Sequence, residues 1–443
     1  MRKFIDTIKN IWSIPELRDR ILIALALVMV YRLGAHVVLP GVDVDAISGA
    51  LQKQSDDNGL LDLINMFSGG AFANASIFAL GIMPYITASI VIQLMTIAVP
   101  YFQRLQKEGE SGRRKITQIT RYLTVLILLV QGSAYIYNIN AQAPNAIAID
   151  PTMFKILSAI CLTAGSMFVM WLGEKITDRG IGNGISIIIM IGIIARLPQA
   201  IVQEISTKFA GGTGGPIVFI LEMVVLFLIF IFSIMLIQAI RKVPLQYAKR
   251  LTGNAQFGGA RQYIPLKLNA AGVMPIIFAQ AIIMLPMYLL RFTQGTEMQE
   301  SWLNSFLLSF TDIKGFTYNF VFFLLIVAFT YFYTAITVNP TQIAEDLKKN
   351  GGFVPGVKPG KNTANHLDMI MSKIILPGAI FLGIIAILPA FAMIAGVDQG
   401  FAMFFGGTSL LILVGVVLDT LQQIESYLLM RHYDGLLKSG KTR

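Results

Sequence analysis

Two stretches decide the fold of this chain: LGIMPYITASIVIQL at residues 80–94 and AGVMPIIFAQAIIML at residues 271–285. Aligned without gaps, they match at seven of fifteen positions, namely Gly81/Gly272, Met83/Met274, Pro84/Pro275, Ile86/Ile277, Ala88/Ala279, Ile92/Ile283 and Leu94/Leu285. Proline inside an apolar helix removes a backbone hydrogen bond and allows a bend, which is tolerated where the freed carbonyl faces protein or water. The repeat therefore predicts two related, bent helices that border a cavity.

The composition is that of a membrane protein. Apolar residues make up 55% of the chain and charged residues only 14%, whereas about 25% of the residues of a soluble domain are charged. Cys161 is the single cysteine, so the sequence excludes an internal disulfide, a cysteine metal site and a redox pair. We therefore expect an all-α integral membrane protein without a metal site.

Apolar runs long enough to cross a hydrocarbon core of about 30 Å can be placed ten times. They cover residues 21–39, 76–99, 118–139, 153–172, 184–203, 217–240, 270–290, 317–338, 370–394 and 403–427. With the N-terminus taken as cytoplasmic, 28 of the 35 Lys and Arg residues lie on the cytoplasmic side and six on the opposite side, while Arg32 is inside the first span. This asymmetry predicts that both termini are cytoplasmic.

A second repeat pairs GISIIIMIG at 184–192 with GTSLLILVG at 407–415. Both repeats place related sequences five spans apart, and because five is odd the two halves enter the membrane in opposite directions. We therefore expect two inverted five-helix halves, 1–209 and 217–443, with the functional site near their pseudo-two-fold axis in mid-membrane. The Gly-rich connection at 210–216 is either an ordinary exterior loop or a hinge between halves that move as rigid bodies.

Two cytoplasmic loops, 241–269 and 339–373, are longer and more basic than span connections require. One reading is topology control plus attraction to anionic lipid, worth about 1 kcal/mol per Lys or Arg near the surface. The other is a docking platform for an acidic partner, such as ribosomal RNA or a protein, because Pro, Gly and Tyr residues give these loops a defined shape. The residues alone leave both readings open.

Several long stretches are distinctive. They are IWSIPELRDRI at 11–21, LINMFSGGAFANASIFALGIMPYITASIVIQL at 63–94, WLGEKITDRGIGNGISIII at 171–189, PLQYAKR at 244–250, PLKLNAAGVMP at 265–275, FVPGVKPG at 353–360 and FGGTSLLI at 405–412. In this order they resemble the SecY family, the central subunits of the protein-conducting channel, which are homologous to the alpha subunit of the eukaryotic translocon. The resemblance implies a clamshell of ten helices around an hourglass pore, with an isoleucine ring at its waist, a plug on the outer side and a lateral gate between the second and seventh spans.

The resemblance assigns the pore ring to isoleucines on the second, fifth, seventh and tenth spans: Ile82, Ile86, Ile185, Ile189, Ile277 and Ile412. The two repeats pair Ile86 with Ile277 and Ile189 with Ile412 independently of the family. A ring of branched apolar side chains would exclude water and ions by dewetting, yet yield to a passing chain because it makes no directional bonds. For any single isoleucine, contact with lipid or core packing is the alternative.

The stretch at 59–76 is too polar and too rich in glycine to span, and by itself it predicts an exterior loop helix. The resemblance makes it the plug, with Met66 and Phe67 as stopper side chains, followed by Ser68 and by a hinge at Gly69 and Gly70. The lateral gate would include Pro84, Gln93 and Pro275. Gln93 and Asn183 either belong to a polar gate cluster or make ordinary interhelical hydrogen bonds.

The family also implies partners: SecE-like and SecG-like small membrane subunits, a SecA-type ATPase motor, the ribosome, signal peptides and nascent chains, and the lipid bilayer of the bacterial plasma (inner) membrane. Contacts to a motor or ribosome are expected at Lys249, Arg250, Lys348, Lys349 and Lys358. Lys358 stands in GVKPG, where the family usually has arginine, and lysine lacks the planar bidentate fork of the guanidinium. This departure bears on any arginine-specific contact at that position.

The expected function is a passive channel that passes unfolded polypeptides outward and releases hydrophobic segments sideways into lipid. No phosphate loop and no nucleophile paired with a base is evident, so we expect neither enzymatic activity nor a cofactor, and a partner must supply the energy. The alternative is an ion-coupled secondary transporter, because inverted repeats with broken helices are typical of that class. It would need charges at mid-membrane; Arg32, His36, Glu222 and Asp419 lie within or near spans, but none lies beside the Met-Pro segments.

Overall fold

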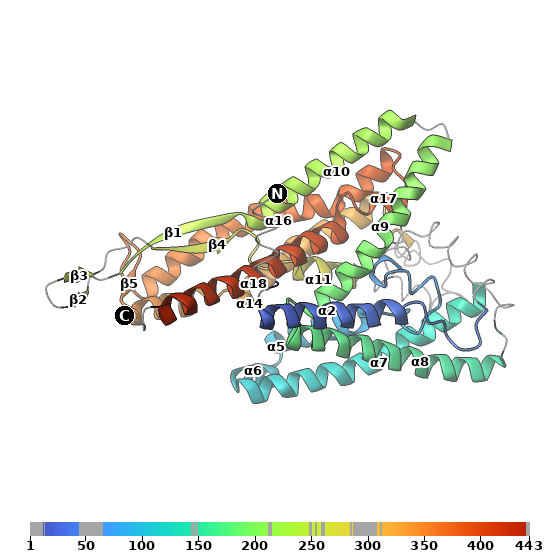
Figure 1. The fold of residues 1–443 in the computed structure, drawn as a ribbon, viewed down its shortest axis with the longest axis horizontal. Helices are drawn as coiled ribbons and strands as arrows, with labels where there is room; N and C mark the ends of the chain where they lie inside the picture. Colours follow the sequence, from blue (N-terminus) through green and yellow to red (C-terminus); the bar gives the residue numbers. More distant parts are fainter. Residues whose placement is uncertain are drawn as a thin grey trace.

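The computed structural model describes residues 12, 14–43, 65–142, 147, 149–210, 215–247, 250–252, 255–257, 262–283, 286, 308–310 and 312–439. Its helices are α2 (Pro15–Gly34), α5 (Met83–Ala98), α6 (Pro100–Lys107), α7 (Glu110–Gln142), α8 (Pro151–Arg179), α9 (Gly184–Ala210), α10 (Gly215–Gln238), α11 (Met274–Ile283), α14 (Phe316–Thr337), α15 (Pro340–Lys349), α16 (Lys361–Ile394), α17 (Gln399–Ala402) and α18 (Gly407–Ser439). Its strands are β1 (Ile240–Tyr247), β2 (Arg250–Thr252), β3 (Ala255–Phe257), β4 (Gln262–Lys267) and β5 (Gly352–Phe353). Most of the long helices follow the long axis of the molecule (Figure 1).

Seven helices in the described part of the chain are long and apolar enough to cross a membrane: α7, α8, α9, α10, α14, α16 and α18. They coincide with seven of the ten expected spans. The pair of α5 and α6, which meet at an angle of 96°, is an eighth candidate. Helices α2 and α11 fall in the first and seventh expected spans, although residues 284–285 and 287–290 lie outside the described residues. The expectation of a helical membrane protein with several spans is confirmed.

The two Met-Pro pairs begin helices and do not bend them. Met83 is the first residue of α5 and Met274 the first residue of α11, so each proline lies in the first turn, where an N–H would have no helical partner. Two residues earlier, Gly81 (φ 53°) and Gly272 (φ 64°) adopt the left-handed backbone conformation that favours glycine. The expected bend inside each span is therefore wrong, and the repeated motif is a helix start.

Helices from the two parts of the sequence form two groups. Helices α2, α5, α7 and α8 lie together, while α10, α14, α16 and α18 form a second group, and α9 runs from the first group towards the second (Figure 1). Across the groups, α5 contacts α11 and α9 contacts α18. The two helices of each repeated pair are therefore neighbours.

The loop at 241–269 contains strands, which an all-α protein would lack. Strand β1 pairs antiparallel with β4 and with β5, while β2 and β3 form a short hairpin at one end of the molecule (Figure 1). Val243 and Leu245 alternate with exposed residues and pack with Leu347 and Leu367 in a second, small apolar core. This alternating burial stabilises a strand that covers α15 and α16. Through β1 and β5, the two basic loops are joined in one sheet.

Candidate functional site

The described part of the plug stretch, residues 65–76, lies inside the molecule, and we call it the plug segment. Residues 59–64 lie outside the described residues. Met66, Phe67 and Ser68 are buried, and the left-handed conformations of Gly69 (φ 66°) and Gly70 (φ 91°) turn the chain back on itself. The turn bonds to itself, because the Asn65 amide oxygen accepts from the Ala73 N–H at 3.1 Å and the Ser68 hydroxyl accepts from the Phe72 N–H at 3.1 Å. The segment is thus a folded unit within the core.

Three side chains from α2 and α7 hold the plug segment through its backbone carbonyls. The hydroxyl of Tyr31 donates to Ser68 O at 3.2 Å, Nη1 of Arg32 to Gly69 O at 2.9 Å, and the hydroxyl of Tyr135 to Phe72 O at 2.7 Å. We call Tyr31, Arg32 and Tyr135 the plug latch. A guanidinium within an apolar span is costly unless it has a polar partner, and the carbonyl of Gly69 is the partner of Arg32. The latch therefore ties the first helix group to the segment.

Gly192 lets the backbone of α9 touch the plug segment from the other side. A Cβ added at this position would lie 2.9 Å from Phe67 O and 3.2 Å from the backbone nitrogen of Gly69. Both neighbours are backbone atoms that cannot turn away as a flexible side chain does. Glycine is therefore required for the close approach of α9 to the segment.

The six isoleucines expected at the pore lie in the interior. Five of them are at most 7% exposed, and Ile185 is half-buried. All six belong to, or pack against, one apolar cluster that also contains Met66 and Phe67. This cluster extends through most of the molecule, so it places the isoleucines in the core, and the ring remains a proposal. The helices that carry them are linked in series, because α5 contacts α11, α11 contacts α18, and α18 contacts α9.

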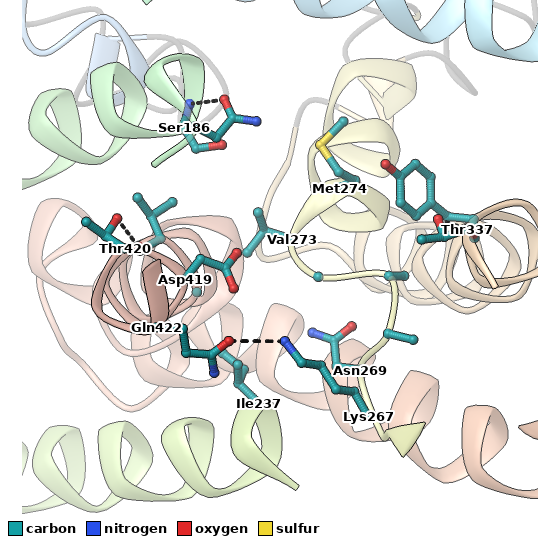
Figure 2. Close-up of a pocket in the computed structure, with 17 residues that line it drawn as sticks. Ser186, Ile237, Lys267, Asn269, Val273, Met274, Thr337, Asp419, Thr420 and Gln422 are labelled. Carbon is teal, nitrogen blue, oxygen red and sulfur yellow. Dashed lines mark hydrogen bonds between the residues drawn. The ribbon is translucent and has the colours of Figure 1, made fainter. Parts of the chain in front are cut away.

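A cavity of about 270 Å³ lies next to these helices (Figure 2). Its lining includes Ser186 of α9, directly after Ile185, and Met274 of α11, three residues before Ile277. The view in Figure 2 shows Asp419 and Lys267 approaching the same opening from different elements, with Lys267 Nζ donating to the Gln422 side chain at 3.3 Å. The cavity thus lies beside the helices that carry the isoleucines.

Gln93 and Asn183 make local hydrogen bonds. The side-chain amide of Gln93 donates to Ser89 Oγ at 3.3 Å within α5. The Asn183 amide oxygen accepts from the backbone N–H of Ile185 at 3.1 Å and of Ser186 at 3.3 Å, which caps the first turn of α9. Among the described residues these bonds stay within α5 or at the start of α9, and a place for the two side chains in a polar gate cluster or between helices stays a prediction. Pro84 and Pro275 are buried in the first turns of α5 and α11.

The expected partner contacts lie around the small sheet. Lys348 and Lys349 are exposed in the last turn of α15, and Lys358 is exposed in the turn that follows β5. Arg250 begins β2, and Lys249 lies outside the described residues. The pairing of Gln246 with Phe353 connects the strand before Arg250 to the loop that carries Lys358. The sheet thus makes one surface from residues about a hundred positions apart.

Sequence reasoning missed the plug latch and the role of Gly192. Arg32 was noted as a charge inside the first span and weighed against a transporter, but a lone arginine in an apolar helix is also a signal that an interior partner exists. Tyr31 and Tyr135 give no such signal, because buried tyrosines in membrane helices are common. Their partners are backbone carbonyls, which sequence patterns do not single out.

Taken together, the fold and the site define a helical membrane protein with several spans and a short polar segment latched in its apolar core. The family model of SecY matches residues 76–421, and the chain belongs to the SecY family. One curated relative, the protein translocase subunit SecY of Streptomyces galbus, is 43% identical, over 96% of this chain and 98% of the relative.

Solved structures with very low sequence identity share the fold. They are a protein conducting channel (16% identical, TM-score 0.61), a SecY protein whose plug domain stabilises the closed state of the translocation channel and maintains a membrane seal (15%, 0.60), and Sec61 in the canine ribosome-channel complex from the endoplasmic reticulum (15%, 0.58). In each case the alignment covers 92% of this chain and 92% of the other.

Proposed function

We propose that this protein is the channel subunit of a protein translocase, which passes unfolded secretory polypeptides across the membrane and releases hydrophobic segments laterally into the bilayer. The observation that carries the proposal is the buried plug segment, held by three latch bonds beside helices that bear the six isoleucines. The name of the 43% identical relative supports it, and it does not favour an ion-coupled transporter. The protein is a channel and not an enzyme, so a partner drives transport.

The proposed architecture has ten spans in two inverted halves, 1–209 and 217–443, with both termini in the cytoplasm. Two observations support the repeat. Gly81 and Gly272 share the left-handed conformation before a Met-Pro helix start, and Gly184 and Gly407 are the first residues of α9 and α18. The excess of basic residues on one side supports the orientation.

Two barriers would close the idle channel. The isoleucines Ile82, Ile86, Ile185, Ile189, Ile277 and Ile412 form an apolar waist that excludes water, and the plug segment covers it from outside. The waist can widen around any sequence because apolar contacts are not directional. The three latch hydrogen bonds are directional, and they form only in the closed state. To move the plug, a passing chain has to break the three latch bonds and the apolar packing of Met66 and Phe67.

The lateral gate would be the seam between α5 and α11. A segment of about ten Leu-like residues gains roughly 3 to 6 kcal/mol in lipid, at about 0.3 to 0.6 kcal/mol per residue. This free energy is sufficient to sort membrane spans from secreted chain at an open seam. Contact between α5 and α11 is the structural support for its position.

The small sheet and α15 form the proposed docking platform for a ribosome or a SecA-type ATPase. Exposed Lys348, Lys349 and Lys358 would bind acidic groups there, together with Lys249 and Arg250. The Sec61 neighbour in a ribosome-channel complex supports a ribosome as one partner. SecE-like and SecG-like subunits would pack on the lipid-facing helices.

A reconstituted channel tests the function and the gate together. In a Cys161→Ser background, cysteine pairs across the seam between α5 and α11 are expected to crosslink in the idle state, since these helices are in contact. The crosslink should abolish the transfer of a secretory precursor into proteoliposomes, measured as protease-protected precursor, and a reducing agent should restore it.

The matched control is a cysteine pair between α5 and α7, which lie in one helix group. That crosslink should leave transfer intact. Full transfer with the α5–α11 crosslink formed would refute the gate. A complete lack of precursor transfer by the uncrosslinked channel, with its motor and ATP present, would refute the proposed function.

Gly192→Ala is expected to weaken the plugged state. The added Cβ must displace the plug segment or α9, and overpacking of this kind costs about 1–3 kcal/mol. Because about 1.4 kcal/mol changes an equilibrium constant tenfold, the idle ion conductance in planar bilayers should rise several-fold to about a hundredfold. Gly132→Ala in α7 is the control, since its Cβ would meet no atom closer than 3.9 Å. Equal conductance for the two variants would contradict the close packing of α9 on the plug.

A further inference from the structure

Three charged side chains are buried where α9 approaches α10. The side chains of Glu204 and Lys208 on α9 and Glu222 on α10 are at most 8% exposed, and we call these residues the ionic cluster. Lys208 Nζ lies 3.4 Å from Glu204 Oε1 and 3.0 Å from Glu222 Oε1. Moving α10 away from α9 would leave Glu222 buried without its cation, which is strongly unfavourable. The cluster therefore holds the last turns of α9 to α10.

The ionic cluster also reaches the connection between α16 and α17. Lys208 Nζ donates to Gly396 O at 2.8 Å, and the backbone N–H of Asp398 donates to Glu204 Oε2 at 2.9 Å. Glu222, Gly396 and Asp398 all belong to the C-terminal half. The end of α9 is thus fixed at three points to the half of the chain that follows it.

The beginning of α9 is bound to the N-terminal half instead. The backbone N–H of Gly184 donates to Thr177 Oγ1 of α8 at 2.8 Å. About two turns further on, Gly192 lies against the plug segment, which the latch ties to α2 and α7. The first turns of α9 therefore have their polar tether in the N-terminal half and its last turns in the C-terminal half, while the backbone N–H of Gly182, just before α9, donates to the Gln423 side chain of α18 at 2.8 Å.

Pro198 lies between these two sets of contacts, inside α9. It has no N–H to donate to the carbonyl of Ile194, and its ring crowds the preceding turn, so the helix is locally weak at this position. A helix whose two ends are bound to different bodies bends most readily at such a point.

We propose that the pivot between the two halves is Pro198 within α9, and that the ionic cluster makes residues 204–210 part of the C-terminal half. The proposal rests on the proposed opening of two halves around a translocating chain. It replaces the Gly-rich connection at 210–216 as the hinge. That connection then joins two helices, α9 and α10, which are already held together and move as one body.

Spin-label distances distinguish the two pivots. In a Cys161→Ser background, Ser206 is replaced by cysteine together with either Ser133 of α7 or Ser372 of α16, all three being exposed positions. Double electron–electron resonance is measured on the full chain in nanodiscs, idle and then engaged by a ribosome carrying a stalled nascent chain with a hydrophobic signal. We expect the 133–206 distance to change on engagement while the 206–372 distance stays constant.

Every other pattern overturns the proposal. A constant 133–206 distance with a changing 206–372 distance would place the pivot after residue 206. Changes in both would show a distributed hinge, and changes in neither, in a channel that still transfers precursor into proteoliposomes, would show that the halves do not move apart. The last result leaves the channel function intact, whereas loss of precursor transfer in the unlabelled protein would count against the function itself.

A second measurement isolates the ionic cluster. Lys208→Gln removes the shared cation, and the idle 206–372 distance distribution is expected to broaden. Lys155→Gln, at an exposed lysine of α8, is the matched control and should leave the distribution unchanged. An unchanged distribution in Lys208→Gln would overturn the role of the cluster as the tether.

Discussion

Simultaneous replacement of Ile86, Ile277 and Ile412 by asparagine is expected to make the idle channel leak ions and accept precursors with defective signal sequences. Each side chain is at most 7% exposed, and an amide buried there without a partner costs about 1–3 kcal/mol in the closed state. Since about 1.4 kcal/mol is a factor of ten, the open population should rise about tenfold or more. Water drawn to three amides would also end the dewetting on which the seal depends.

Ion conductance in planar bilayers and precursor transfer with a defective signal measure this effect. The control is the triple replacement of the same isoleucines by valine, which keeps the waist branched and apolar and should leave conductance near that of the unaltered channel. A comparison of melting temperatures shows whether the asparagine variant is folded. A folded asparagine variant with unchanged conductance and unchanged signal selection would rule out the ring.

Lys208→Met is expected to give the largest loss of stability of any single replacement considered for this protein. It leaves Glu204 and Glu222 buried and without their cation, and breaking a buried ion pair in this way costs about 3–5 kcal/mol. Thermal unfolding in detergent should therefore show a clear fall in melting temperature. Lys155→Met removes an exposed lysine and should shift the melting temperature little.

A triple variant separates the loss of the charge pair from the loss of the lysine side chain. Lys208→Met combined with Glu204→Gln and Glu222→Gln removes all three charges, so no uncompensated charge remains buried. This variant should recover much of the lost melting temperature. If it is as unstable as Lys208→Met alone, the destabilisation comes from packing and not from charge.

The apolar spans were predictable because length and hydropathy act locally. Seven of the ten expected spans correspond to helices that meet both criteria. The Met-Pro repeat was recognised, but its meaning was reversed: the same proline that breaks a helix interior is favoured in a first turn, and only the left-handed Gly81 and Gly272 reveal which applies. The pairing of β1 with β4 was missed because each strand places only a few apolar residues in alternation, such as Val243 and Leu245 in β1.

The candidate site was predictable where it depends on residue types that can be recognised in the sequence. The six isoleucines and the plug residues were identified by resemblance, and all of those described lie in the interior. The plug latch, Gly192 and the ionic cluster depend on which backbone atoms approach them in three dimensions. Lys208 and Glu222 are fourteen residues apart on different helices, so sequence spacing alone does not pair them.

The plug latch has a consequence for how this segment can vary. Tyr31, Arg32 and Tyr135 bind carbonyl oxygens, which every amino acid carries, so these three bonds do not depend on the identities of Ser68, Gly69 and Phe72 as acceptors. What the bonds require is the backbone path, which the left-handed Gly69 and Gly70 provide. In the proposed channel, substitutions in the partly exposed part of the segment, around Ala73 and Asn74, should therefore leave the latch bonds intact.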